Sequence, residues 1–127
     1  MIKVEVEGTS FLFATTHLDH TAAEDNRILQ ANTIVNDILP GLTLPLIIGG
    51  DLNAIPESET IGILSGKLTA GCKGNTCPLT FPYNAPNRTL DYIMINDKKA
   101  FEFKSYKVVS GVTASDHLPV IAEIKLK

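Results

Sequence analysis

The chain has 127 residues, of which 44% are hydrophobic and 20% charged, and its formal net charge is −3 at pH 7. This length suffices for one domain, which buries about two-thirds of the surface of its unfolded chain. No apolar stretch approaches the roughly 20 residues that span a bilayer. The acidic balance also disfavours non-specific binding to duplex nucleic acid, which depends on clusters of lysine and arginine.

The amino-terminal residues predict two strands. Apolar and charged residues alternate over Met1–Glu7, so this strand should turn Ile2, Val4 and Val6 inward. Glu5 and Glu7 would then be solvated charges on its other side. The apolar run that starts at Phe11 predicts a second strand.

The middle of the chain predicts helices around a third strand. Apolar residues recur at helical spacing through Thr21–Leu39, and Pro40-Gly41 ends the segment. The apolar run from Leu46 predicts a buried strand that ends at Gly49-Gly50. A shorter helix over 58–64 should be capped by Ser58.

The remainder predicts a long loop and three strands. The loop, Lys67–Thr89, is rich in glycine, proline and asparagine, and ordered loops of more than about 15 residues are usually functional or mobile. Strands are expected over Asp91–Ile95, Phe101–Val109 and Val120–Leu126. The predicted order is therefore β-β-α-β-α-loop-β-β-β.

Polar side chains gather where three of these strands begin or end. Ligands of open α/β sheets bind outside the carboxyl ends of strands, and residues i and i+2 of an extended chain face the same way. An ordinary turn or an inert histidine would explain each group singly. The groups are His17, Asp19 and His20, then Asp51 and Asn53, and finally Asp116 and His117.

The ordered combination of these motifs resembles the endonuclease/exonuclease/phosphatase superfamily, whose members are metal-dependent phosphoesterases with a pancreatic deoxyribonuclease-like fold. Thr80-Phe81-Pro82 is similar to a T-F-P stretch of bacterial members. The motifs are T-T-H-L-D-H with His17, G-G-D-L-N-A with Asp51 and Asn53, R-T-L-D-Y-I-M with Asp91, and S-D-H-L-P-V with Asp116-His117.

The resemblance implies an α+β fold that is part of a four-layer α/β sandwich. Residues 1–127 would form a single partial domain, roughly one β-sheet with a covering helix. Family members begin with a further half-domain, which supplies a metal-binding glutamate and is missing from this sequence. We therefore expect the chain alone to be weakly active or inactive.

The resemblance also implies catalytic roles for five residues in hydrolysis of a phosphodiester or phosphomonoester by in-line water attack. Asp51 would orient or deprotonate the water, and Asn53 would hold the water or the phosphate. His17 and His117 would donate hydrogen bonds to phosphate oxygens. Asp91 would fix the tautomer of His117 and raise its pKa.

Other residues would bind the cofactor and substrate. Asp116 would be a ligand of Mg²⁺ (or Mn²⁺), because hard oxygen ligands favour such ions. Arg88 would contact an anionic substrate, and Asp19 and His20 would support the residues that touch it. The acidic charge favours a small phosphoester over duplex nucleic acid.

The resemblance implies that the sheet face without a covering helix packs on the other half of the sandwich. In this chain that face would be bare, which predicts self-association. Each large apolar side chain left in water forfeits about 1.5 to 3 kcal/mol, and exposed apolar patches often become interfaces. A two-fold homodimer is the commonest closed arrangement. A non-catalytic, self-associating binding module is therefore the alternative function.

Two cysteines and one serine leave further alternatives open. Cys72 and Cys77 lie within the long loop without the additional ligands of a zinc site. A disulfide would favour an exported or periplasmic protein, whereas two free thiols would suit the cytosol. The amino end lacks the continuous apolar core of a signal peptide, and the possible disulfide gives a slight preference for an exported or periplasmic protein. A serine hydrolase that uses Ser115 as nucleophile and His117 as base is a poor alternative, because the sequence has no G-x-S-x-G motif.

Overall fold

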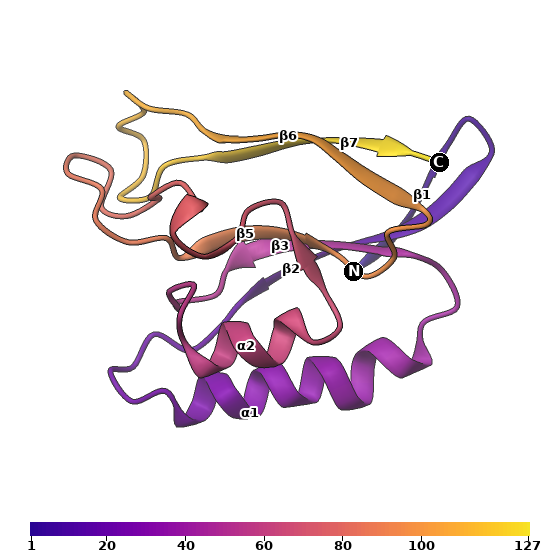
Figure 1. Ribbon diagram of the computed structural model, residues 1–127, viewed down its shortest axis with the longest axis horizontal. Coiled ribbons are helices and arrows are strands. Elements are labelled where there is room, and N and C mark those ends of the chain that lie inside the picture. Colours follow the sequence, from indigo (N-terminus) through magenta and orange to yellow (C-terminus); the bar gives the residue numbers. More distant parts are fainter.

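The computed structural model describes all 127 residues, which form three layers (Figure 1). A five-stranded sheet lies in the middle, two helices cover one face, and a two-stranded sheet lies over the other. The central strands are, in spatial order, β1 (Ile2–Val6), β2 (Thr9–His17), β3 (Leu46–Asp51), β5 (Asp91–Ile95) and β4 (Thr69–Ala70). The helices are α1 (Asp25–Thr33) and α2 (Glu59–Ser65), and the second sheet pairs β6 (Phe101–Val108) with β7 (Val120–Leu126).

The pairing of β2, β3 and β5 brings three strand ends to one place. β2 and β3 run parallel with His17 opposite Asp51, and β3 and β5 run antiparallel with Asp51 opposite Asp91. These three residues consequently form one row across the sheet.

The helical layer differs from the predicted helix in where it begins. α1 starts at Asp25 instead of Thr21, and it continues as a π-helical segment over Ile34–Ile38 and a 3₁₀ turn over Leu39–Gly41. The segment before α1 is held as a loop because Nη1 of the buried Arg27 donates to the carbonyl oxygens of Asp19 and Thr21.

The second helix and the late strands match their predicted positions closely. α2 begins after Ser58, whose Oγ accepts a hydrogen bond from the amide of Ile61, as a helix N-cap does. The long loop is more structured than predicted, because β4 and a 3₁₀ turn over Gly74–Thr76 lie within it. Cys72 and Cys77 form a disulfide in this loop.

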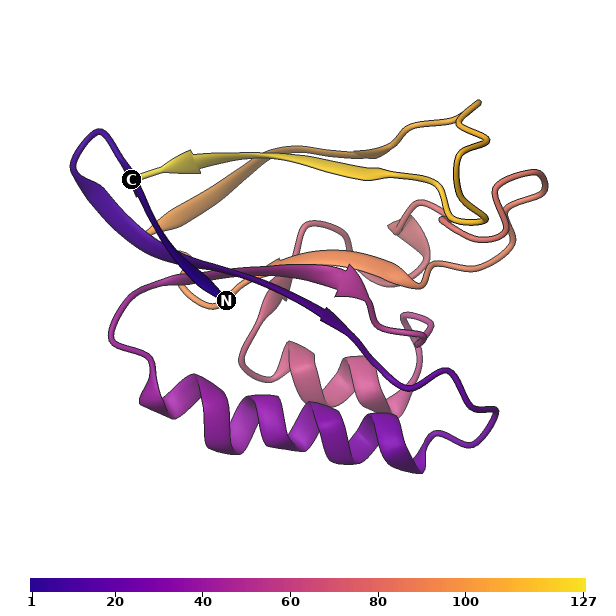
Figure 2. The ribbon, with the colours of Figure 1, turned by 180° about the vertical axis from the view of Figure 1, so that it is seen from behind.

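The structure has a second, two-stranded sheet where the sequence predicted roughly one sheet: β6 and β7 pair with each other and lie over the face of the central sheet that the helices leave free (Figure 2). The rings of Phe11 and Phe101 meet edge to face at 5.7 Å between the sheets. Ile47 and Ile95 complete this small core. A larger core lies between the central sheet and the helices.

The cover over the central sheet does not reach all of β1 and β2. Ile2 is 63% exposed and Val6 44% exposed, so the predicted inward face of β1 is buried only in part, at Val4. Phe13, which pairs with Ile2 across the hairpin, is 44% exposed. An apolar strip thus stays in contact with solvent. No helix combines the length and apolar character needed to cross a membrane.

Candidate active site

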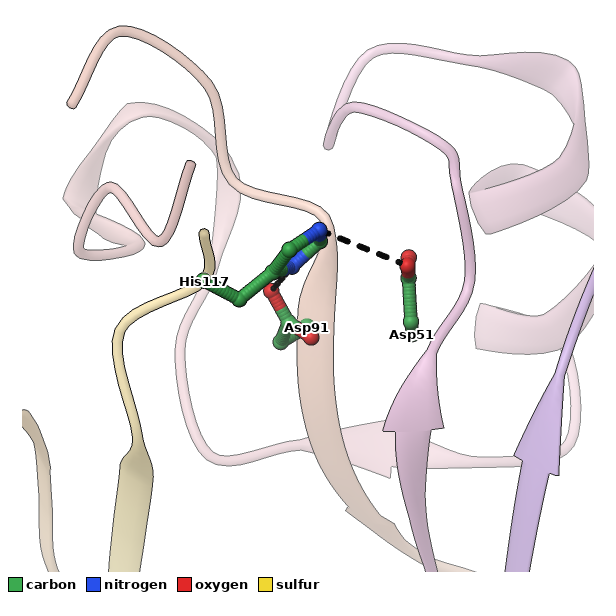
Figure 3. Close-up of side chains that lie close together, drawn as sticks. All are labelled: Asp51, Asp91 and His117. Atoms are coloured by element: carbon green, nitrogen blue, oxygen red, sulfur yellow. Dashed lines mark hydrogen bonds and ion pairs between the residues drawn. The ribbon is translucent and has the colours of Figure 1, made fainter. Parts of the chain in front are cut away.

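His117 lies between two carboxylates at the carboxyl end of β3 and the start of β5 (Figure 3). Its Nδ1 is 2.8 Å from Oδ2 of Asp91, and its Nε2 is 3.7 Å from Oδ2 of Asp51. A carboxylate can only accept, so Nδ1 of His117 carries the proton in this hydrogen bond. When the ring is protonated, Nε2 also carries a proton, and it faces the Asp51 carboxylate as a donor.

The close approach of β2 and β3 depends on Gly50. This residue has φ of +150°, and a Cβ at its position would lie 1.8 Å from the carbonyl oxygen of Thr16. Glycine therefore lets the strand continue beyond Gly49-Gly50, where the sequence predicted its end, to Asp51. The carboxylate of Asp51 is set at the end of a rigid strand as a result.

Asn53 is fixed by two hydrogen bonds. Its backbone amide donates to Oδ1 of Asp51 at 2.8 Å, and its Nδ2 donates to the carbonyl oxygen of Leu18 at 3.0 Å. The left-handed backbone at Asn53, with φ of +47°, is a conformation that asparagine tolerates better than most residues. Asn53 therefore ties the loop after β3 to the loop after β2 beside Asp51.

His17 completes the row. Its Nε2 lies 3.4 Å from Oδ2 of Asp51, and its side chain is 71% exposed. His17 and His117 therefore approach the same carboxylate oxygen from two different segments. The structure thus brings together all five residues that the sequence analysis assigned to catalysis.

The other predicted residues lie outside this cluster. The exposed Asp116 precedes His117, and its Oδ1 lies 3.4 Å from Oγ of Ser115. Asp19 accepts hydrogen bonds from the amide and hydroxyl groups of Thr21, and His20 is exposed beside it. None of these residues forms a hydrogen bond or ion pair with the side chains of Asp51, Asp91 or His117.

Arg88 reaches the cluster through an aromatic ring that the sequence analysis gave no role. The Arg88 guanidinium carbon lies 4.9 Å from the centre of the Phe81 ring, and that ring lies 4.8 Å from the His117 ring. Cation–π attraction holds a guanidinium in such a position. The T-F-P stretch was the only sequence signal at Phe81.

The surrounding charges favour the protonated form of His117. Partial burial opposes that form, but the hydrogen bond to Asp91 and the charges of Asp91, Asp51 and Asp116 outweigh it. The pKa of His117 consequently lies above its ordinary value. The ring is thus suited to donate to an anion.

The donor atoms of this cluster fit a hard divalent cation in part. One ligand atom each from Asp51, Asp91 and His117 lie within 4.8 Å of one another, and carboxylate oxygens suit Mg²⁺ or Mn²⁺. However, Asp91 and His117 are already hydrogen-bonded to each other, so an ion bound by both would have to replace that bond. Asp51 is the carboxylate that remains available beside them.

Comparison with known proteins places this fold and cluster in a family. Residues 2–117 match the family described as Endonuclease/Exonuclease/phosphatase family, and no curated protein matches the chain significantly in sequence. The chain therefore belongs to the endonuclease/exonuclease/phosphatase family, which confirms the resemblance.

Solved structures agree with this assignment. The mannosyl-6-phosphatase Bt3783 of Bacteroides thetaiotaomicron VPI-5482 has a TM-score of 0.75 and 24% identity, over 94% of this chain and 53% of that one. The human Nocturnin catalytic domain with bound sulfate has a TM-score of 0.74 and 26% identity, over 95% and 49%. D. rerio TDP2 with a single-stranded DNA product has a TM-score of 0.73 and 16% identity, over 97% and 59%.

The chain spans about half the length of these structures, and it carries the fold expected of part of a deoxyribonuclease-like sandwich. Membership in this family supports hydrolase as the general class of the protein.

Proposed function

We propose that the protein hydrolyses a phosphoester in a reaction that depends on a divalent metal ion. The observation that supports this function most directly is the placement of His117, which is hydrogen-bonded to Asp91 at 2.8 Å while its other nitrogen faces Asp51. One histidine held by a carboxylate, beside a second carboxylate, can orient both a water molecule and an anion.

Each residue has one task in this proposal. Asp51 accepts a proton from the attacking water or aligns it, and His17 and His117 in their protonated forms donate to the non-bridging phosphate oxygens. Asn53 holds Asp51 through its backbone amide, and its side-chain amide has a second N–H for the phosphate. Asp91 keeps the His117 ring in one orientation.

Asp51 would hold the metal ion, Mg²⁺ or Mn²⁺, and the proposed further ligand is the exposed Asp116, whose charge acts on His117. When bound, the ion neutralises charge on the phosphate and assists the leaving group. We expect weak affinity for metal and weak activity for the 127 residues alone, because they span about half the length of the structures that they match. A small phosphoester is the proposed substrate, with Arg88 contacting a second anionic group beside Phe81.

Hydrolysis of an aryl phosphodiester and of an aryl phosphomonoester, each with Mg²⁺ or Mn²⁺, tests the proposal. Asp51→Ala and His117→Ala should abolish metal-dependent turnover, and EDTA should abolish it in the unmodified chain. A matched control is Asp37→Ala, which changes an exposed acid on the helical layer. Equal rates for all four proteins would contradict the proposal.

The exposed strip of Ile2, Val6 and Phe13 favours a second candidate, a self-associating module that keeps the fold. A homodimer through this strip would cover the part of the central sheet that β6 and β7 leave open. In sedimentation experiments, Phe13→Ser should shift such a dimer toward monomer. Leu29→Ser is the control, because Leu29 is 67% exposed on α1, which covers the opposite face. A monomer at all concentrations would exclude this candidate.

The Cys72–Cys77 disulfide supports an oxidising compartment, so we propose that the protein is exported or periplasmic. Fractionation of the native host with an antibody to the protein tests this. Recovery in the cytosol with reduced thiols would contradict it.

A further inference from the structure

Thr80 is fully buried next to the catalytic cluster, and the mechanism above gives it no task. It lies in the loop before β5, and its Oγ1 accepts hydrogen bonds from the amides of Leu90 at 3.0 Å and Asp91 at 3.3 Å. A threonine hydroxyl has two acceptor positions. Both serve the backbone from which the Asp91 side chain projects.

The backbone of Thr80 holds the other partner of the Asp91–His117 pair. Its carbonyl oxygen accepts a hydrogen bond from the amide of Leu118 at 2.8 Å. Three residues further on, the amide of Tyr83 donates to the carbonyl oxygen of Asp116 at 2.8 Å. The segment 80–83 therefore fixes the backbone on both sides of His117.

These bonds matter because Asp91 and His117 belong to different sheets. Asp91 is the first residue of β5 in the central sheet, whereas His117 lies in the loop that leads into β7 of the second sheet. A hydrogen bond of 2.8 Å between them needs the two sheets to be held in one relative position. Thr80 is bonded to both segments and is itself immobilised by burial.

We propose that Thr80 is a positioning residue that holds Asp91 and His117 in hydrogen-bonding register. Its contribution to turnover rests on the proposed hydrolysis, but its structural effect on the His117 ring does not. Valine at this position would fill the same volume and leave the amides of Leu90 and Asp91 without the hydroxyl acceptor. Serine would keep that acceptor.

The test is the protonation pattern of the His117 ring, read from its ¹⁵N chemical shifts in metal-free protein at a pH where the ring is neutral. The unmodified chain should show the proton on Nδ1, because Asp91 accepts it there. Thr80→Val should shift a measurable fraction to Nε2, whereas Thr80→Ser should keep the proton on Nδ1. Thr60→Val is the control, since Thr60 is equally buried but bonds to Glu24, away from the cluster.

Three results would overturn the inference. The first is a His117 ring in Thr80→Val that is the same as in the unmodified chain, and the second is an equal shift in Thr60→Val. If Thr80→Val does not fold, amide hydrogen exchange in the unmodified chain decides, because the inference requires slow exchange at Leu90, Asp91 and Leu118. The third result is amide exchange at Leu90 or Asp91 that is as fast as in an exposed loop.

Turnover separates this inference from the proposed function. If the unmodified chain hydrolyses the aryl phosphoester, Thr80→Val should lower kcat on the order of tenfold to a hundredfold with little change in KM, because misplacing a catalytic group slows the chemical step. If no protein hydrolyses the ester while the ring still responds to Thr80→Val, the proposed function fails and the positioning role stands.

Discussion

Asp51 and Asp91 lie directly opposite each other in the antiparallel pairing of β3 with β5. Like charges at such positions destabilise a sheet by up to about 1 kcal/mol. His117 lies near both carboxylates but is hydrogen-bonded only to Asp91. The two acids should therefore respond differently to loss of charge.

Asp51→Asn should leave the free energy of unfolding unchanged or raise it by up to about 0.5 kcal/mol, because it relieves repulsion and keeps an acceptor for the Asn53 amide. Asp91→Asn relieves the same repulsion but should lower it by about 1 to 2 kcal/mol, because the hydrogen bond from His117 loses its charge assistance. Urea unfolding at pH 7 in EDTA measures both. Because both substitutions remove the same repulsion, equal changes in the two variants would show that the His117 hydrogen bond does not distinguish the two acids.

The raised pKa of His117 predicts a pH-dependent stability. A group whose pKa is higher in the folded than in the unfolded state stabilises the fold fully below its unfolded pKa, which is about 6.5 for histidine. That stabilisation is lost as the pH rises through the folded pKa. The free energy of unfolding should therefore fall with rising pH above about 6.5.

His117→Asn should lack this decrease, whereas the exposed His20→Asn should retain it. The comparison is made in metal-free buffer, since a bound cation would compete with the proton. A decrease of the same size in His117→Asn would assign it to another group.

The sequence could predict the strand ends at the site, because an apolar run followed by polar residues is a local pattern. It could not predict the register that sets Asp51 opposite Asp91, because that pairing joins segments 40 residues apart. The site residues assigned from the motifs came together, but Thr80 and Phe81 had no local signal of their contacts. Their roles depend on a loop that folds against two sheets.

The division into two sheets also lay beyond the sequence. Asn96–Lys99 has the composition of a turn and joins two predicted strands, which is the pattern of a hairpin. β5 instead pairs with β3 and β4, while β6 pairs with β7. Burial of Phe101 against Phe11 explains this outcome, because the chain must cross to the next layer to place that ring inside.

The disulfide should stabilise the protein through its short loop. Cys72 and Cys77 are five residues apart, and the entropy lost by closing such a loop in the unfolded chain corresponds to about 2 kcal/mol. The free energy of unfolding, measured by thermal denaturation, should be lower by about this amount when a reducing agent is present. The doubly substituted Cys72→Ser, Cys77→Ser protein should be insensitive to the reducing agent, and a remaining response would point to another effect of the agent.

Gly50 and Gly62 should respond oppositely to alanine. At Gly50 the new methyl group would lie 1.8 Å from the Thr16 carbonyl oxygen, and φ of +150° strains any side chain. Gly50→Ala should lower the free energy of unfolding by at least about 3 kcal/mol, because β2 and β3 must separate where the site is built.

Gly62→Ala should raise the free energy of unfolding by about 1 kcal/mol, because Gly62 is exposed in α2, a Cβ there meets no atom within 4 Å, and alanine is the better helix former. Chemical unfolding of both variants beside the unmodified chain measures the difference. If Gly50→Ala unfolded at the same urea concentration as the unmodified chain, β2 and β3 could not approach as closely as the structure has them. The pairing that aligns His17, Asp51 and Asp91 would then be contradicted.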